Sequence, residues 1–68
     1  MTDVARLSER ISASGIKKVF LADKCGLTYQ GLLNKLDGKT EFNVTEARAL
    51  KDALGLTNKE AVDIFFAN

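Results

Sequence analysis

The shortness of the chain is the feature that most limits its fold. A chain of 68 residues buries only about 60% of the surface that its unfolded form exposes, so it cannot be divided between two hydrophobic cores. We therefore expect residues 1–68 to form one domain. The sequence contains one cysteine and no histidine, which excludes an intramolecular disulfide and leaves a zinc site without its usual ligands. Packed helices must then supply the stability.

Glycines and capping residues divide the chain into five expected helices. No proline occurs, and apolar residues recur every three or four positions between the breaks, which is the period of an amphipathic helix. The expected helices cover residues 3–14, 17–25 and 29–36, a fourth segment from the Asn43 cap to the residue before Gly55, and a short fifth segment from the Thr57 cap. Both caps belong to capping-box patterns, closed by Glu46 and Glu60. No segment has the alternation of a strand, so the expected fold class is all-α.

Residues 17–36 form the pattern with the clearest functional meaning. A short helix, a turn at residues 26–28 and a second helix make up the unit that lays its second helix in the major groove of DNA. Ala22 should be small because the two helices cross closely there, while Leu32 and Leu36 anchor the second helix to the core. A glycine between two helices also occurs in ordinary helical hairpins. The spacing by itself therefore leaves a generic helix bundle as an equal alternative.

The second helix of this unit has a polar side suited to reading DNA. A helical wheel places Gln30, Gly31, Asn34 and Lys35 opposite the apolar residues. Glutamine and asparagine amides can pair with the edge of adenine, lysine can donate to guanine or phosphate, and glycine permits close approach. Tyr29 stands at the start of the helix, where side chains reach furthest into the groove.

Charge is distributed unevenly along the chain. Residues 15–40 hold five lysines and two aspartates, a net charge of +3, whereas residues 41–68 hold three basic and five acidic residues, a net charge of −2. Such asymmetry is expected when one face of a protein meets phosphates. Lys17 and Lys18 stand at the positive end of the second expected helix, so they offer a phosphate clamp.

The segment KKVFLADKCGLTYQGLLNKLDGKT, residues 17–40, resembles the helix-turn-helix of the Cro/repressor-type (XRE-like) phage regulators. EFNVTE at residues 41–46 and AVDIFFA at residues 61–67 resemble small phage-encoded members in particular. The resemblance covers the whole chain and implies a five-helix, lambda-repressor-like domain that regulates transcription by binding operator DNA. It implies a phosphate contact at Lys18, base contacts at Tyr29, Gln30 and Asn34, neighbouring positions at Thr28, Gly31 and Leu33, and a backbone contact at Lys39.

Some residues depart from this family pattern. Asp37 replaces an asparagine that often precedes the glycine, and Cys25 occupies a usual leucine position. Val19, Phe20 and Leu33 are apolar where the family has polar residues. These three residues support an alternative function, a protein-interaction module on the same fold that acts as an anti-repressor or antitoxin-like partner.

The end of the chain suggests self-association. Single short modules usually bind specific DNA as symmetric dimers. Phe65 and Phe66 are adjacent, so they cannot both point inward from one helix. We therefore expect a homodimer, at least on double-stranded DNA, with Ile64, Phe65 and Phe66 as its contact.

The sequence argues against enzymatic and membrane functions. It has no histidine, no paired carboxylates in a plausible cleft and no phosphate-binding glycine loop, and it is too short to enclose a pocket. We therefore expect no enzyme activity, no cofactor, no metal and no small-molecule substrate. No apolar run approaches the roughly 20 residues that span a bilayer, and the first residues do not resemble a signal peptide. A cytoplasmic protein without membrane contact is expected.

Overall fold

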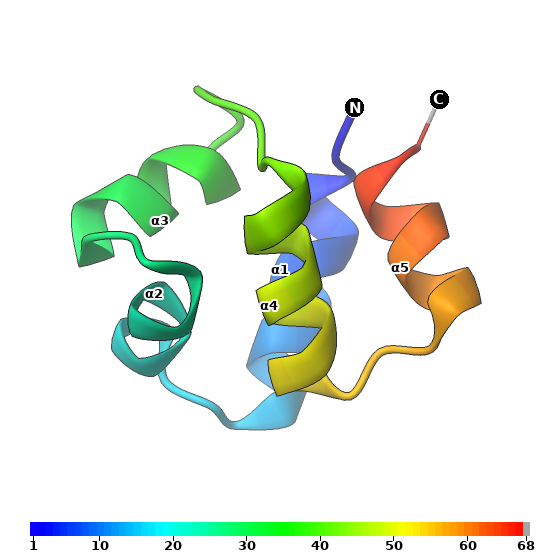
Figure 1. The fold of residues 1–68 in the computed structure, drawn as a ribbon, viewed down its shortest axis with the longest axis horizontal. Helices are drawn as coiled ribbons and strands as arrows, with labels where there is room; N and C mark the ends of the chain where they lie inside the picture. Colours follow the sequence, from blue (N-terminus) through cyan, green and yellow to red (C-terminus); the bar gives the residue numbers. More distant parts are fainter. Residues whose placement is uncertain (68) are drawn as a thin grey trace.

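The computed structural model describes residues 1–67, and over that range it consists of helices and loops without a strand (Figure 1). The five helices are α1 (Val4–Ser14), α2 (Lys18–Cys25), α3 (Tyr29–Leu36), α4 (Val44–Leu54) and α5 (Asn58–Phe65). Each helix begins within one residue of its predicted start, so the prediction of an all-α chain with five helices is confirmed. In the part of the chain that the structure describes, no helix has the length and apolar character needed to cross a bilayer.

The helices are arranged around a central pair. α1 and α4 lie in the middle of the molecule, with α2 and α3 on one side and α5 on the other (Figure 1). The N-terminal segment lies beside the end of α5, where the amide of Asp3 donates to the carbonyl of Ile64 at 2.7 Å. α3 and α5 lie at opposite ends of the longest axis of the molecule (Figure 1). The Cα atoms extend over 26 Å along this axis.

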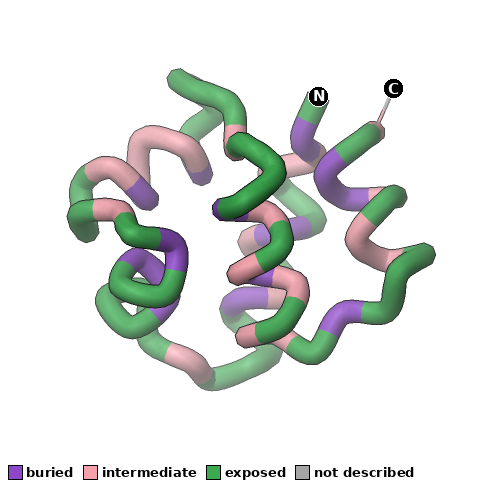
Figure 2. Tube along the Cα trace, viewed as in Figure 1, coloured by how far each residue is buried: buried purple, intermediate pink, exposed green. Residues whose placement is uncertain are grey.

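Each helix contributes one fully buried aliphatic side chain to a common core. These side chains are Leu7, Leu21, Leu32, Leu50 and Ile64. The inner faces of the helices carry this buried layer, which forms the purple segments of the tube in Figure 2. Burying one such side chain stabilises the folded state by about 1.5–3 kcal/mol, a large share of the stability of a short domain.

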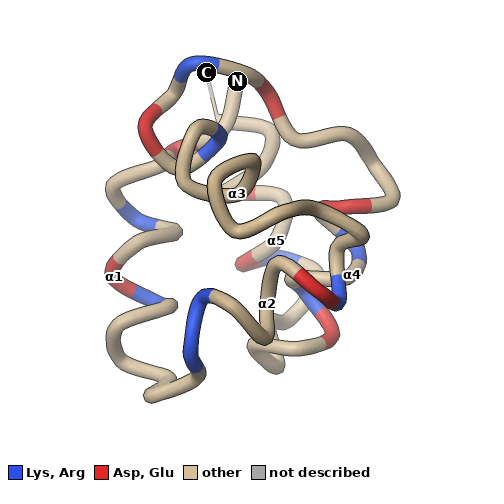
Figure 3. The backbone as a smooth tube through the Cα atoms, turned by 90° about the vertical axis from the view of Figure 1, so that its left-hand side faces the viewer, with Lys and Arg blue, Asp and Glu red and all other residues tan. Residues whose placement is uncertain are grey.

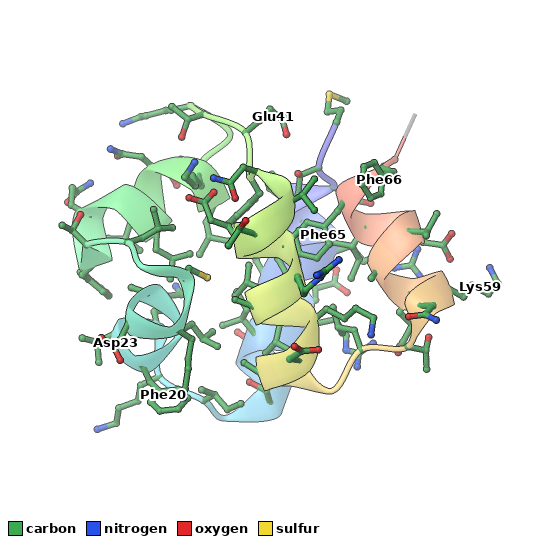
Figure 4. All side chains as sticks on the ribbon, in the orientation of Figure 1. Phe20, Asp23, Glu41, Lys59, Phe65 and Phe66 are labelled. Atoms are coloured by element: carbon green, nitrogen blue, oxygen red, sulfur yellow. The ribbon has the colours of Figure 1, made fainter. Side chains whose placement is uncertain are left out.

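The burial of α5 corrects the predicted dimer contact. Ile64 is fully buried, and the ring of Phe65 packs edge-on against Phe42 with 5.8 Å between the ring centroids. Ile64 therefore cannot reach a second chain, so the expectation that Ile64 forms part of a dimer contact is wrong, and Phe65 is only 6% exposed. Phe66 projects outward (Figure 4), as expected for one of two adjacent phenylalanines. The helical period alone could not show which ring turns inward.

Side chains cap four of the five helices at their starts. The capping residues are Asp3, Thr28, Asn43 and Thr57. Both predicted capping boxes are confirmed, because Glu46 and Glu60 accept hydrogen bonds from the backbone amides of their caps at 3.0 Å and 2.9 Å. Such a cap contributes about 1 kcal/mol. Only α2 begins without a side-chain cap.

Glu60 joins α5 to α1. Its carboxylate accepts a hydrogen bond from the amide of Thr57 and pairs with the guanidinium of Arg10. The hydrogen bond from the Thr57 backbone, and to a smaller extent that from Arg10, holds the pKa of Glu60 below its usual value. The folded state therefore favours the charged carboxylate. This contribution to stability is complete above the usual carboxyl pKa and is lost as the pH falls through the lowered pKa of the folded state.

We predict that Glu60→Gln lowers the free energy of unfolding near neutral pH, and that the difference from the wild type shrinks on acidification toward about pH 2. The reason is that protonation of Glu60 removes the same charge from the wild-type protein. Urea denaturation at several pH values measures the difference. Glu9→Gln, an equal charge change at an exposed position of α1, serves as the control. A difference that widens at acid pH would contradict this account.

Candidate nucleic-acid interface

A tight turn joins α2 to α3. Gly26 has a φ of +72°, and the amide of Leu27 donates to the carbonyl of Ala22 at 2.9 Å. A side chain at Gly26 would meet no atom within 4 Å, so the glycine is needed for its backbone conformation and not for space. Thr28 then starts α3 by accepting a hydrogen bond from the amide of Gly31 at 2.9 Å.

Buried side chains fix the angle of α3. Ala22, Leu32 and Leu36 are all buried, as predicted for a close helix crossing and its two anchors. Cys25 is also buried, and its thiol donates to the backbone carbonyl of Glu46 at 3.7 Å. Burial raises the pKa of the Cys25 thiol, and the nearby Glu46 carboxylate raises it further. Cys25 therefore acts as a small core residue.

The exposed side of α3 carries two amides that interact with each other. Gln30 donates from Nε2 to Oδ1 of Asn34 at 3.0 Å, one helical turn away. This bond aligns the two side chains and leaves the Gln30 carbonyl oxygen and the Asn34 amide hydrogens available. Tyr29 is half-exposed at the helix start, and Thr28 is exposed beside it. Gln30 is exposed, and Asn34 and Leu33 are both half-buried.

The presence of glycine at position 31 has a structural reason that the sequence does not reveal. A Cβ atom added at this position would lie 3.0 Å from Oγ1 of Thr28, the atom that caps α3. A larger residue would therefore disturb the start of the helix. From the sequence alone, this glycine is expected only to permit close approach to DNA.

The structure contradicts the prediction that Lys35 faces DNA. Its side chain is only 15% exposed, and its Nζ lies 3.1 Å from Oε1 of Glu46 and donates to the carbonyl of Glu41 at 2.8 Å. Lys35 stands near the edge of the polar arc of α3, so its long side chain can reach the start of α4. There the Glu46 carboxylate, in a side chain only 9% exposed, requires a positive partner.

Glu46 has a positioning role that the sequence does not reveal. The sequence indicates only that Glu46 closes a capping box. In the structure its carboxylate also pairs with Lys35, and its backbone carbonyl accepts a hydrogen bond from the Cys25 thiol. Eleven positions separate Lys35 from Glu46 along the chain, and the loop between α3 and α4 brings them together. A capping-box glutamate gives no sequence signal for such a second role.

A second cationic region lies at the start of α2. Lys17 and Lys18 are both exposed, and they form the blue stretch between α1 and α2 in Figure 3. Since no side chain caps α2, its first backbone amides and the positive end of its dipole face outward beside these lysines. Lys39 is exposed in the turn after α3, near the exposed Asp37.

Pairing with Glu46 reduces the charge that this region can offer to phosphates. Without Lys35, residues 15–40 present four lysines against two aspartates, a net charge of +2. One of these lysines, Lys24, lies 5.1 Å from the ring centroid of Phe20. Val19 and Phe20 are exposed on α2, and Phe20 lines a shallow groove with Ala49 and Ala53 of α4.

Comparisons of the chain with models of known families, with curated proteins and with solved structures find no match. Among residues 1–67, no group of three or more potential metal ligands lies close together.

We predict that Lys35→Met destabilises the protein by roughly 1–3 kcal/mol, because it leaves the mostly buried Glu46 carboxylate without its cation. Adding Glu46→Gln to this variant should restore part of the loss, since glutamine can still accept from the Asn43 amide. Lys39→Met, at an exposed position, is the matched control and should change stability little. Urea denaturation measures all four proteins. Equal losses in Lys35→Met and Lys39→Met would exclude the buried pair as the cause.

Proposed function

We propose that this protein is a sequence-specific DNA-binding transcription regulator of the Cro/repressor type, which inserts α3 into the major groove of an operator. One observation carries the proposal. Leu32 and Leu36 are buried on one side of α3, while Gln30 is exposed and Asn34 partly exposed on the other side. A helix held in this way can enter the groove without losing its contacts with the core.

The proposed base contacts come from the coupled amides. Gln30 offers an acceptor and Asn34 offers donors, so together they can match the acceptor and donor on the adenine edge. Because their mutual hydrogen bond holds them in place, little side-chain freedom is lost when DNA binds. Tyr29 and Thr28 flank them at the helix start.

The proposed phosphate contacts come from α2 and from the turn after α3. Lys18 and the first amides of α2 can hold a phosphate together, since both present positive charge in one direction. Lys17 and Lys39 extend this contact on either side. Lys35 is not part of it, and its proposed role is to hold α3 at the angle that docking requires. Bound protein would then block access to the operator sterically, without a cofactor.

We predict that Lys18→Glu weakens binding to all duplexes and reduces the slope of log affinity against log salt by about 1. The duplexes are those that the wild-type protein selects from a random pool, together with a scrambled sequence. Lys59→Glu, the same charge reversal at an exposed position of α5, is the control and should bind nearly as well as the wild type. Fluorescence anisotropy at several salt concentrations gives both affinities and slopes. Equal effects of the two reversals would contradict the proposed docking.

Gln30→Ala and Asn34→Ala should behave differently from Lys18→Glu. Each is expected to lose roughly 1–3 kcal/mol of discrimination between the selected and the scrambled duplex, while binding to the scrambled duplex changes little. Thr45→Ala, at an exposed position of α4, is the control. Should both alanine variants keep full discrimination, α3 would not be the reading helix.

The alternative function is a protein-interaction module that uses Val19 and Phe20. The exposure of these two residues and the groove beside Phe20 favour it. Binding through such an apolar surface would respond little to salt, whereas operator binding weakens steeply as salt rises. Failure to select any sequence from the random DNA pool would favour this alternative.

A further inference from the structure

The turn between α3 and α4, residues 37–40, is polar, and all four of its residues are exposed. Backbone hydrogen bonds close its α3 side. The amide of Gly38 donates to the carbonyl of Lys35 at 3.1 Å, and the amide of Lys39 donates to the carbonyl of Asn34 at 3.0 Å. Gly38 has a φ of +80°, a conformation that often ends a helix in this way. Since the turn buries no apolar side chain, its position depends on polar contacts.

Glu41 holds the other side of the turn. Its carboxylate oxygen Oε2 accepts hydrogen bonds from the backbone amide of Thr2 at 3.3 Å and from the hydroxyl of Thr2 at 3.1 Å. Its backbone carbonyl accepts from Nζ of Lys35 at 2.8 Å. Glu41 therefore lies between the turn and the N-terminal segment (Figure 4). One residue thus ties the end of the turn to two different parts of the chain.

Thr2 is a fixed partner for this contact. It is only 8% exposed. The next residue, Asp3, caps α1, because its side chain accepts from the amide of Arg6 at 3.1 Å and its carbonyl accepts from the amide of Leu7 at 3.0 Å. The N-terminal segment is consequently attached to the central helix α1. It can therefore hold Glu41 in place.

Thr2 and Glu46 are the two buried residues with polar or charged side chains among residues 1–67. Burial of a polar group costs free energy unless the group is hydrogen-bonded. Both buried groups act on the segment that contains the turn. Glu46 pairs with Lys35 before the turn, and Thr2 donates to Glu41 after it. The buried polar contacts of the described chain therefore meet at the two sides of one exposed turn.

We propose that Thr2 and Glu41 are positioning residues, which hold Lys39 where it meets a DNA phosphate. This inference rests on the proposed function. Lys39 is exposed in the anchored turn, and its backbone amide is bonded to Asn34 of the proposed reading helix. The anchor therefore fixes the backbone of Lys39 relative to Asn34. A cation on a fixed backbone loses less freedom on binding than one on a free loop, and phosphate contacts set the register of a protein on the duplex.

Amide hydrogen exchange of the full chain, without DNA, tests the anchor. Thr2→Val keeps the shape of the buried side chain but removes its hydroxyl. The amides of Gly38 and Lys39 should then exchange roughly three- to tenfold faster, as expected for the loss of one hydrogen bond. Thr2→Ser keeps the hydroxyl and should exchange like the wild type. The amides of Gly55 and Leu56 close α4 with bonds of the same kind, and they should be unaffected in both variants.

Fluorescence anisotropy with the selected and the scrambled duplex tests the role in DNA binding. Thr2→Val should weaken binding to both duplexes and reduce the slope of log affinity against log salt by up to about 1, as expected for one phosphate contact. The same change made in Lys39→Met should have no further effect, because the contact is already lost. A contact that only stabilises the fold would instead weaken binding equally with and without Lys39.

Three results would overturn the proposal. They are unchanged exchange at Gly38 and Lys39 in Thr2→Val, an equal increase in exchange at Gly55 and Leu56, and an equal loss of DNA affinity in the wild-type and Lys39→Met backgrounds. Failure of the proposed function gives a different result, in which the wild type selects no duplex while Thr2→Val still speeds exchange at the turn. That result would remove the role of Lys39 at phosphate and leave the anchor.

Discussion

The short α3 helix cannot keep its position without the rest of the fold, and the proposed reading surface depends on how this helix is held. A helix of eight residues is not stable in water by itself. Three contacts of different kinds fix it: Leu32 is fully buried in the core, Thr28 caps its start, and Lys35 ties its last turn to Glu46. Because these contacts lie on one side, the amides of Gln30 and Asn34 remain accessible on the other.

The Lys35–Glu46 pair changes how the basic region of the chain must be understood. The net charge summed along the sequence includes Lys35, yet the charge of Lys35 is neutralised by Glu46 inside the fold. The accessible surface around α2 and α3 is therefore only modestly positive. Modest charge gives weak binding to arbitrary DNA, so in the proposed function the affinity for one site would have to come mainly from base contacts.

The central pair of helices, α1 and α4, separates the α2–α3 unit from α5 (Figure 1). α1 and α4 contact both α5 and the α2–α3 unit, so a change at either end reaches the other only through the core. The proposed reading surface on α3 is polar, whereas the groove between α4 and α5 is apolar. Each surface can thus be altered by substitution while the other remains as a reference.

Local patterns determined much of this structure from the sequence alone. The helix starts at Asn43 and Thr57, the turn at Gly26 and the inward positions of Leu32 and Leu36 depend on hydrogen bonds and spacing within a few residues, which the sequence displays directly. The tertiary structure decided what depends on distant segments: the burial of Lys35 against Glu46, the choice of Phe65 over Phe66 for the core, and the exposure of Val44 beside α5. These outcomes differ because the helical period shows which side chains share a face, but only packing decides what that face meets.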